Sequence, residues 1–216
     1  MRGDGYRLPM GKRLLVYDGT AKAGEKLLRS AWSTGAKLYR GMRRVDATHG
    51  AASWEGALAW LVSQGEHEGI DEVQFWGHGK WGKVYIAGDV LERAQLRPDH
   101  PQHDLVKALR TRLSPGALVW FRTCETFGAA PGQAFAQHLS DFLGARVAGH
   151  TFVIGALQSG LHGLLPGARP HWPLTEGLRE GTAEDPRDAH DSAPGAPNTL
   201  HFMNGRIPDA WFRASS

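Results

Sequence analysis

The sequence predicts an α/β protein, a three-layer αβα sandwich around a mostly parallel central sheet. Short apolar runs typical of buried strands alternate along the chain with stretches whose apolar residues repeat at helical spacing. This order favours parallel strands joined by helices that cover the sheet. The length of 216 residues is enough for one domain with a sizeable core, and we expect residues 1–216 to form a single domain.

The first elements follow the strand-then-helix order. Residues 13–17 (RLLVY) predict a strand that ends at the turn pair Asp18-Gly19. A helix is expected over about residues 21–32, with Thr20 as its N-cap, and residues 37–40 predict a second strand.

A capped helix leads to the third strand. Ser53 is expected to cap a helix whose apolar residues are Trp54, Leu58, Leu61 and Val62. The run at residues 73–76 (VQFW) then predicts a strand, and residues 83–88 predict a short β-excursion beside its end.

The second half of the chain repeats this order. Leu105, Leu109 and Leu113 predict a helix that ends before Ser114, and residues 117–121 (ALVWF) predict a buried strand. The next helix begins near Pro131 and ends at Gly144.

Two strands and a long loop complete the expected chain. Residues 146–148 and 151–155 predict strands, and residues 199–203 predict a last one. Between them, residues 164–197 are rich in Gly, Pro and charged residues, which indicates a long loop that is partly mobile.

Composition and charge exclude several function classes. The formal charge of +3 comes from 25 Lys and Arg against 22 Asp and Glu, and the one basic block is short, at residues 40–44, so we expect no nucleic-acid partner. The N-terminus has no signal-peptide pattern and no run could span a bilayer, so we expect a cytoplasmic protein without membrane contact. A single cysteine excludes an internal disulfide.

That cysteine and one histidine each follow a predicted strand. Cys124 comes soon after residues 117–121, and His78 lies in Gly77-His78-Gly79 directly after residues 73–76. Because the carboxyl ends of parallel strands meet at one edge of a sheet, the pair could form a thiol–imidazole dyad. The competing interpretation is an inert buried thiol and a hydrogen-bonded turn histidine. Continued strand geometry would turn the side chain of Glu125 away from that of Cys124.

Other chemistries have little support. The chain has 11 histidines but no HExxH motif, and Glu66-His67-Glu68 is typical of a solvated loop, so we expect no metal site. No Walker or GxGxxG motif predicts a nucleotide site, and residues 155–160 do not form the G-x-S-x-G turn of serine hydrolases. We expect no cofactor.

The residues around the strand-end histidine and cysteine resemble those of a known family. Residues 120–126 (WFRTCET) resemble the strand and Cys-Glu-Thr signature of CHAT-type members of the caspase-like (clan CD) cysteine peptidases, in which a strand ending in His-Gly comes some tens of residues earlier. Residues 132–147 are similar to the helix and strand that follow the cysteine in an uncharacterised bacterial branch. The Q-A-C-x-G signature of true caspases is absent, which disfavours a caspase proper.

The resemblance implies a caspase-like fold and a function. Cys124 would be the nucleophile, His78 the base, and the backbone N–H groups of Gly79 and Cys124 the oxyanion donors. Arg122 and Asp18 would line the substrate pocket. They would form a mutual ion pair, or an unpaired Arg122 would give a preference for acidic residues, or a dominant Asp18 would give a preference for basic residues. The expected partner is a peptide or protein substrate. A catalytically silent caspase-like binding or scaffold module is the alternative, and the oligomeric state is left open.

Overall fold

The computed structural model describes residues 11–20 and 26–212, and a six-stranded sheet lies at its centre. The strand order is β10-β8-β7-β3-β1-β2, in which β10 is antiparallel and the other five strands are parallel. This confirms a mixed α/β protein with a mostly parallel sheet. The strands are β1 (Lys12–Asp18), β2 (Ala47–Ala51), β3 (Ile70–Trp76), β7 (Leu113–Arg122), β8 (Arg146–His150) and β10 (Leu161–Leu164).

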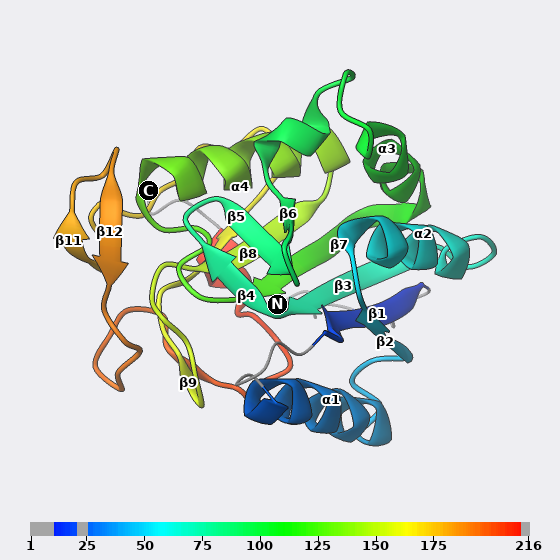
Figure 1. Ribbon diagram of the computed structural model, residues 1–216, viewed down its shortest axis with the longest axis horizontal. Helices are drawn as coiled ribbons and strands as arrows, with labels where there is room; N and C mark the ends of the chain where they lie inside the picture. The colour runs from blue at the N-terminus through cyan, green and yellow to red at the C-terminus, as the bar shows by residue number, and fades with distance from the viewer. Residues whose placement is uncertain (1–10, 21–25, 213–216) are drawn as a thin grey trace, which may run out of the picture.

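Helices lie on both faces of this sheet (Figure 1). The helices are α1 (Lys26–Gly41), α2 (Trp54–Gln64), α3 (His103–Arg112) and α4 (Ala129–Leu143). The last three bury their apolar side chains in one large core cluster, while α1 packs on the opposite face against Leu15 and Trp76. Within the described ranges, none of the helices combines the length and the apolar character that crossing a bilayer requires.

Local sequence signals predicted the start of α2 and the end of α4 correctly, whereas the first helix, expected to end near Trp32, continues to Gly41. The Ser53 side chain accepts a hydrogen bond from the Gly56 backbone N–H at 3.1 Å, which confirms the predicted N-cap of α2. Gly144 ends α4 with a φ of 61°, a left-handed conformation that glycine adopts without steric penalty. The helix expected to include Leu113 ends one residue earlier, because Leu113 already belongs to β7.

The predicted strand at residues 37–40 is wrong, because these residues belong to α1. Ala36 and Tyr39 are buried whereas Leu38 is exposed, a pattern with helical rather than strand periodicity. The second strand is instead β2 at the sheet edge, and its sequence, ATHGA, has little apolar character. The predicted helix start at residues 21–25 lies outside the described residues.

A small second sheet follows β3 and confirms the predicted β-excursion. It consists of β4 (His78–Lys80), β5 (Lys83–Ile86) and β6 (Asp89–Leu91), and η1 (Arg93–Leu96) follows it. The indole N–H of Trp54 donates to the Val84 carbonyl oxygen at 2.9 Å, so α2 holds this small sheet against the core.

The predicted strand at residues 151–155 is also wrong. The chain turns back after β8, with the Thr151 N–H donating to the Gly160 carbonyl oxygen at 3.1 Å, and then forms β10. The turn carries β9 (Leu157–Gln158), which pairs with β13 (Leu200–His201) from the expected last strand. The apolar run at residues 151–155 therefore belongs to a turn, because its backbone bonds to residues on the returning side of that turn rather than to a neighbouring strand.

The segment 164–197 has more structure than a loop. It contains a hairpin of β11 (Leu178–Gly181) and β12 (Pro186–Ala189). Before the hairpin, the buried Trp172 donates its indole N–H to the Phe127 carbonyl oxygen at 3.0 Å. The segment is thus anchored to the body, and its mobility stays a prediction. The described chain ends with η2 (Asp209–Phe212).

Candidate functional site

The register of two neighbouring strands places His78 and Cys124 at one edge of the sheet. Trp76, the last residue of β3, is the Cα partner of Arg122, the last residue of β7. His78 and Cys124 each follow one of these paired positions by two residues. The strands are parallel, so both residues stand at carboxyl ends, as the sequence predicts.

The loops that carry these two residues are in contact. The backbone N–H groups of Trp81 and Gly82 donate to the carbonyl oxygens of Glu125 and Thr126, at 3.2 and 2.8 Å. A Cβ atom added to Gly79 would lie 2.7 Å from Thr123 Oγ1 and would overlap Thr126 Oγ1. Only glycine allows the strand β4 to lie this close to the segment after β7.

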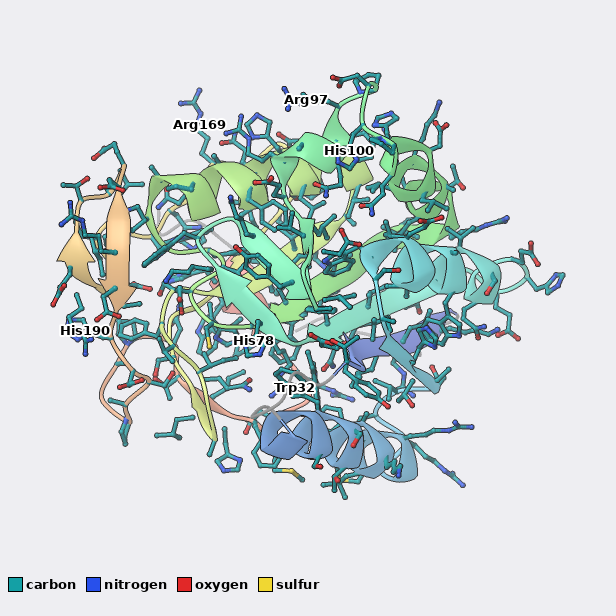
Figure 2. All side chains as sticks on the ribbon, in the orientation of Figure 1. Trp32, His78, Arg97, His100, Arg169 and His190 are labelled. Carbon is teal, nitrogen blue, oxygen red and sulfur yellow. The ribbon has the colours of Figure 1, made fainter. Side chains whose placement is uncertain are left out.

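Helix α1 supplies a neighbour for the imidazole. The ring of Trp32 meets the ring of His78 edge to face, with 5.2 Å between their centroids (Figure 2). His78 is half-buried at the start of β4. The indole thus limits the orientations that this imidazole can adopt.

Cys124 is half-buried, and its thiol contacts the turn after β8. The Ile154 N–H donates to Cys124 Sγ at 3.5 Å, and Sγ lies 3.9 Å from the Ile154 carbonyl oxygen. The pKa of the Cys124 thiol is raised to about 11, mainly by burial and also by the nearby carboxylates of Glu125 and Asp191, and the backbone N–H groups of Ile154 and Cys124 oppose this rise. In this arrangement the sulfur is a neutral thiol at physiological pH.

The segment that covers Cys124 is held by a distant part of the chain. The Val153 N–H donates to the His190 carbonyl oxygen at 3.0 Å, and the Ser192 N–H donates to the Val153 carbonyl oxygen at 2.8 Å. The residues just after the β11–β12 hairpin therefore fix the residue next to Ile154. Sequence reasoning missed this cover, because no local pattern links residues about 40 positions apart.

Glu125 departs from the expected strand geometry. Its φ of 29° turns the backbone out of the extended conformation, and its side chain is buried. Burial raises the pKa of this carboxyl to about 7, with the charge of Lys80 opposing the rise. Glu125 Oε2 has no hydrogen-bond partner in the described part of the chain. A buried carboxyl that titrates near neutral pH thus lies beside the thiol.

Arg122 is buried by partners on the α1 face. Its guanidinium donates to Gln158 Oε1 from Nε at 2.9 Å and from Nη2 at 2.7 Å, and also to the Tyr39 hydroxyl and the Phe202 carbonyl oxygen. It also lies over the ring of Trp120, with Cζ 4.5 Å from the centroid. Burial lowers the pKa of this guanidinium.

Asp18 has different partners. Its Oδ1 accepts from the backbone and hydroxyl of Thr20 at 2.8 and 2.6 Å, and its Oδ2 accepts from the Ala87 N–H at 3.0 Å. Among the described residues, no ion pair joins Asp18 to Arg122, so the expected mutual pair is not formed. The assignment of both residues to a substrate pocket stays a prediction.

Two other histidines, His150 and His162, are buried in the protein interior. His162 Nε2 lies 2.5 Å from Glu176 Oε1, and its ring stacks on Trp172. Burial lowers the pKa of His150 to about 3, which keeps this imidazole neutral. Over the residues that the structure describes, no group of three or more His, Cys, Asp or Glu side chains is arranged to hold a metal ion.

Comparison with known proteins gives one family. Residues 27–165, more than half of the chain, match the sequence profile described as a domain of unknown function, DUF4347. The chain belongs to the DUF4347 family. The part that matches the DUF4347 profile contains both His78 and Cys124 and ends just after β10, so the β11–β12 hairpin lies beyond it. No curated protein and no solved structure matches this DUF4347 member.

Proposed function

We propose that the protein is a cysteine peptidase in which Cys124 is the nucleophile and His78 the general base. His78 would accept the thiol proton as sulfur attacks the scissile carbonyl, and would return it to the leaving amine. Water would then hydrolyse the thioester and restore the thiol. The backbone N–H groups of Gly79 and Cys124 are the proposed oxyanion donors.

The observation that carries this proposal is the pairing of Trp76 with Arg122. It sets His78 and Cys124 each two residues beyond the ends of adjacent parallel strands, and the fit of Gly79 against Thr123 brings their loops into contact. A mostly parallel sheet with helices on both faces is also what the caspase-like resemblance implies. We therefore propose a caspase-like three-layer sandwich for the fold. The resemblance to a bacterial branch and the single cysteine support a bacterial cytoplasmic setting in this proposal.

The arrangement around the thiol corresponds, in this proposal, to a closed form of the enzyme. A neutral thiol covered by Ile154 is a poor nucleophile. An incoming peptide would have to displace the turn at residues 151–154, after which the imidazole could stabilise the thiolate as an ion pair. In many enzymes, substrate binding likewise moves a loop that lies over the active site.

One observation favours a second function. The raised pKa of the Cys124 thiol is also what an inert structural cysteine would show, so a catalytically silent caspase-like binding or scaffold module is the alternative. The two functions differ in whether a bound peptide can bring Cys124 into reaction.

A peptidyl electrophile tests the proposal directly. We would incubate the protein with a library of peptidyl acyloxymethyl ketones, which place a reactive carbon at the scissile position, and locate adducts by mass spectrometry. The proposal expects at least one peptide to modify Cys124 in the wild type, and much more slowly in His78→Ala. Modification at equal rates in both proteins would remove His78 from the mechanism. No modification by any peptide would favour the binding module.

A further inference from the structure

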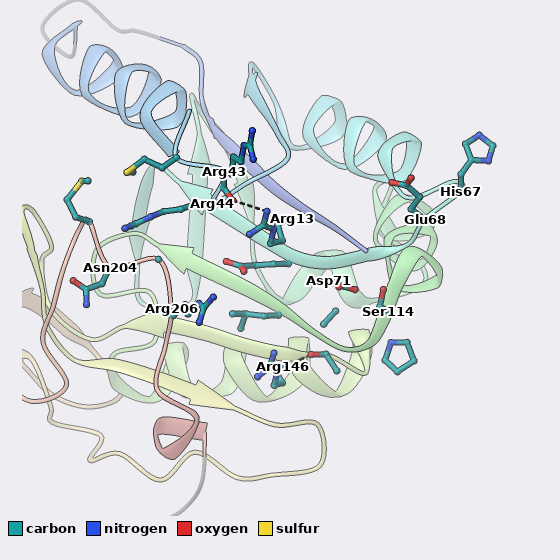
Figure 3. A pocket seen from close by; sticks show the side chains of 18 residues that line it. Arg13, Arg43, Arg44, His67, Glu68, Asp71, Ser114, Arg146, Asn204 and Arg206 are labelled. Atoms are coloured by element: carbon teal, nitrogen blue, oxygen red, sulfur yellow. Dashed lines mark hydrogen bonds between the residues drawn. The ribbon is translucent and has the colours of Figure 1, made fainter. Parts of the chain in front are cut away.

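A large hollow of the protein is lined by neither Cys124 nor His78. It has a volume of about 1440 Å³ and lies on the α1 face of the sheet, toward the amino ends of the strands (Figure 3). We call it the amino-end groove. Its floor contains a row of residues paired across four adjacent strands, namely Arg13, Glu72, Leu118 and Arg146. The groove is therefore built on the sheet itself.

One end of the groove is rich in arginine. Arg43 and Arg44 come from the residues that follow α1, and Arg206 comes from the segment after β13 (Figure 3). Arg43 is exposed, whereas Arg44 is held between the Tyr39 ring, 5.2 Å from its Cζ, and the backbone of Gly205. Two of these arginines belong to the short basic block of the sequence, which therefore borders a cavity.

The other end of the groove carries carboxylates. Glu68 and Asp71 lie there beside His67 and Ser114, at the far side from Arg44 and Arg206 (Figure 3). The Glu68 side chain is 63% exposed and lies 3.9 Å from Lys12 Nζ, a distance at which an exposed pair is weak. The groove therefore has opposite charges at its two ends.

The charged side chains in the floor of the groove have partners within the protein. Pro115, Ala117 and Leu118 contribute apolar surface to its lining. Glu72 in the floor accepts a hydrogen bond from Gln74 Nε2 at 2.7 Å, so its carboxyl already has a partner within the protein. Arg13 is paired with Asp46 at 2.8 Å, and Arg146 lies 3.7 Å from Asp209.

We propose that the amino-end groove binds an extended peptide segment of a partner protein, with an acidic stretch along Arg43, Arg44 and Arg206 and a basic stretch near Glu68 and Asp71. The volume exceeds the roughly 300–1,000 Å³ of sites for small molecules, which favours a chain segment over a metabolite. A nucleic acid carries negative charge along its whole length and would meet the carboxylate end. This binding goes beyond the proposed peptidase function, because the groove lies away from the edge that carries Cys124.

The test is a titration followed by fluorescence anisotropy. The probe is a labelled peptide with four glutamates, four alanines and four lysines in that order, and the control peptide has the same composition with Glu and Lys alternating. All titrations use the Cys124→Ala protein, so that the proposed peptidase cannot consume the probe. We expect the block peptide to bind at least about fivefold more tightly than the alternating one, and its affinity to fall with added salt.

Charge-reversal variants locate the binding. Arg43→Glu and Glu68→Lys should each weaken binding of the block peptide about fivefold. The matched control is Arg97→Glu, an exposed arginine near η1, which should change the affinity less than about twofold. With a peptide of twelve glutamates, the effect of Glu68→Lys on affinity should be the opposite. This variant should bind that peptide more tightly than the Cys124→Ala protein from which it is made.

Three results would overturn the proposal. These are no binding of the block peptide, equal loss of affinity in Arg97→Glu and Arg43→Glu, or tighter binding of a single-stranded oligonucleotide than of the block peptide. The last result would assign the groove to a polyanion. Thermal unfolding followed by circular dichroism verifies that each variant is folded.

Discussion

The backbone N–H of Ile154 donates a hydrogen bond to Cys124 Sγ at 3.5 Å. This contact joins the half-buried thiol of Cys124, the single cysteine of the chain, to a turn that comes after β8, the next strand along the sheet. Together with burial, it defines a closed state in which the sulfur is protonated, because the pKa of the thiol is raised to about 11.

The first prediction concerns reaction with a small electrophile. Iodoacetamide should alkylate Cys124 at pH 7 about a hundredfold more slowly than free cysteine, because the thiolate is the reactive form. The rate should rise tenfold per pH unit up to about pH 10. Mass spectrometry at a series of pH values measures it. A fast reaction with a plateau below pH 7 would mean that an imidazolium–thiolate pair already exists in the free protein.

Glu125 should make stability depend on pH. Its pKa in the folded protein is raised to about 7, so its contribution to stability is fully present below its ordinary pKa and is lost as the pH rises through 7. Glu125→Gln should therefore raise the unfolding free energy at pH 8 by on the order of 2 kcal/mol, with little change at pH 4.5.

Urea denaturation at these two pH values measures this effect, and Glu184→Gln, at an exposed position, is the control. If Glu125→Gln changed stability equally at both pH values, the carboxyl would not titrate in this range.

Arg122 should be a major contributor to stability. Arg122→Met removes the donors to Gln158, Tyr39 and Phe202 and leaves their buried oxygens without these partners. We expect a loss of about 3 kcal/mol in the free energy of unfolding. Arg97→Met, at an exposed position, should change it by less than about 0.5 kcal/mol. A loss for Arg122→Met no larger than that of the control would show that Arg122 is free to face a substrate.

The contact between the two loops depends on the absence of a side chain at residue 79. Gly79→Ala would push β4 away from Thr123 and Thr126, so we expect a loss of about 2 kcal/mol in stability and slower modification of Cys124 by peptidyl electrophiles. Gly88→Ala is the matched control, because a Cβ at Gly88 meets nothing within 4 Å. If the two variants had the same stability and the same rate of Cys124 modification, the position of the His78 loop would not affect the reactivity of Cys124.

The sequence predicted the strands of the sheet where apolar residues are contiguous. The runs that became β3 and β7 are buried on both faces, so their composition alone marks them as strands. The edge strand β2 has a partner on one side only and the sequence ATHGA, so no apolar pattern marked it. Tyr39 was assigned to a strand because three or four residues cannot distinguish a strand from the end of a helix.

For the candidate site, sequence reasoning located the strand ends but not what covers them. His78 and Cys124 follow apolar runs directly, so their common edge could be predicted. Two features of the site could not be predicted, because one depends on long-range contacts and the other on a single backbone angle. The cover by Ile154 requires the pairing of Val153 with residues 190–192, and the positive φ of Glu125 turns that side chain into the interior.

The most direct measurement of the central claim is cleavage of a proteome-derived peptide library, read by mass spectrometry, by the wild type, Cys124→Ala and His78→Ala. Our account predicts that the wild type cuts a defined set of peptides, that Cys124→Ala cuts none, and that His78→Ala cuts the same set at least about a hundredfold more slowly. Cleavage that persists in Cys124→Ala, or a folded wild type that cuts no peptide, would contradict it.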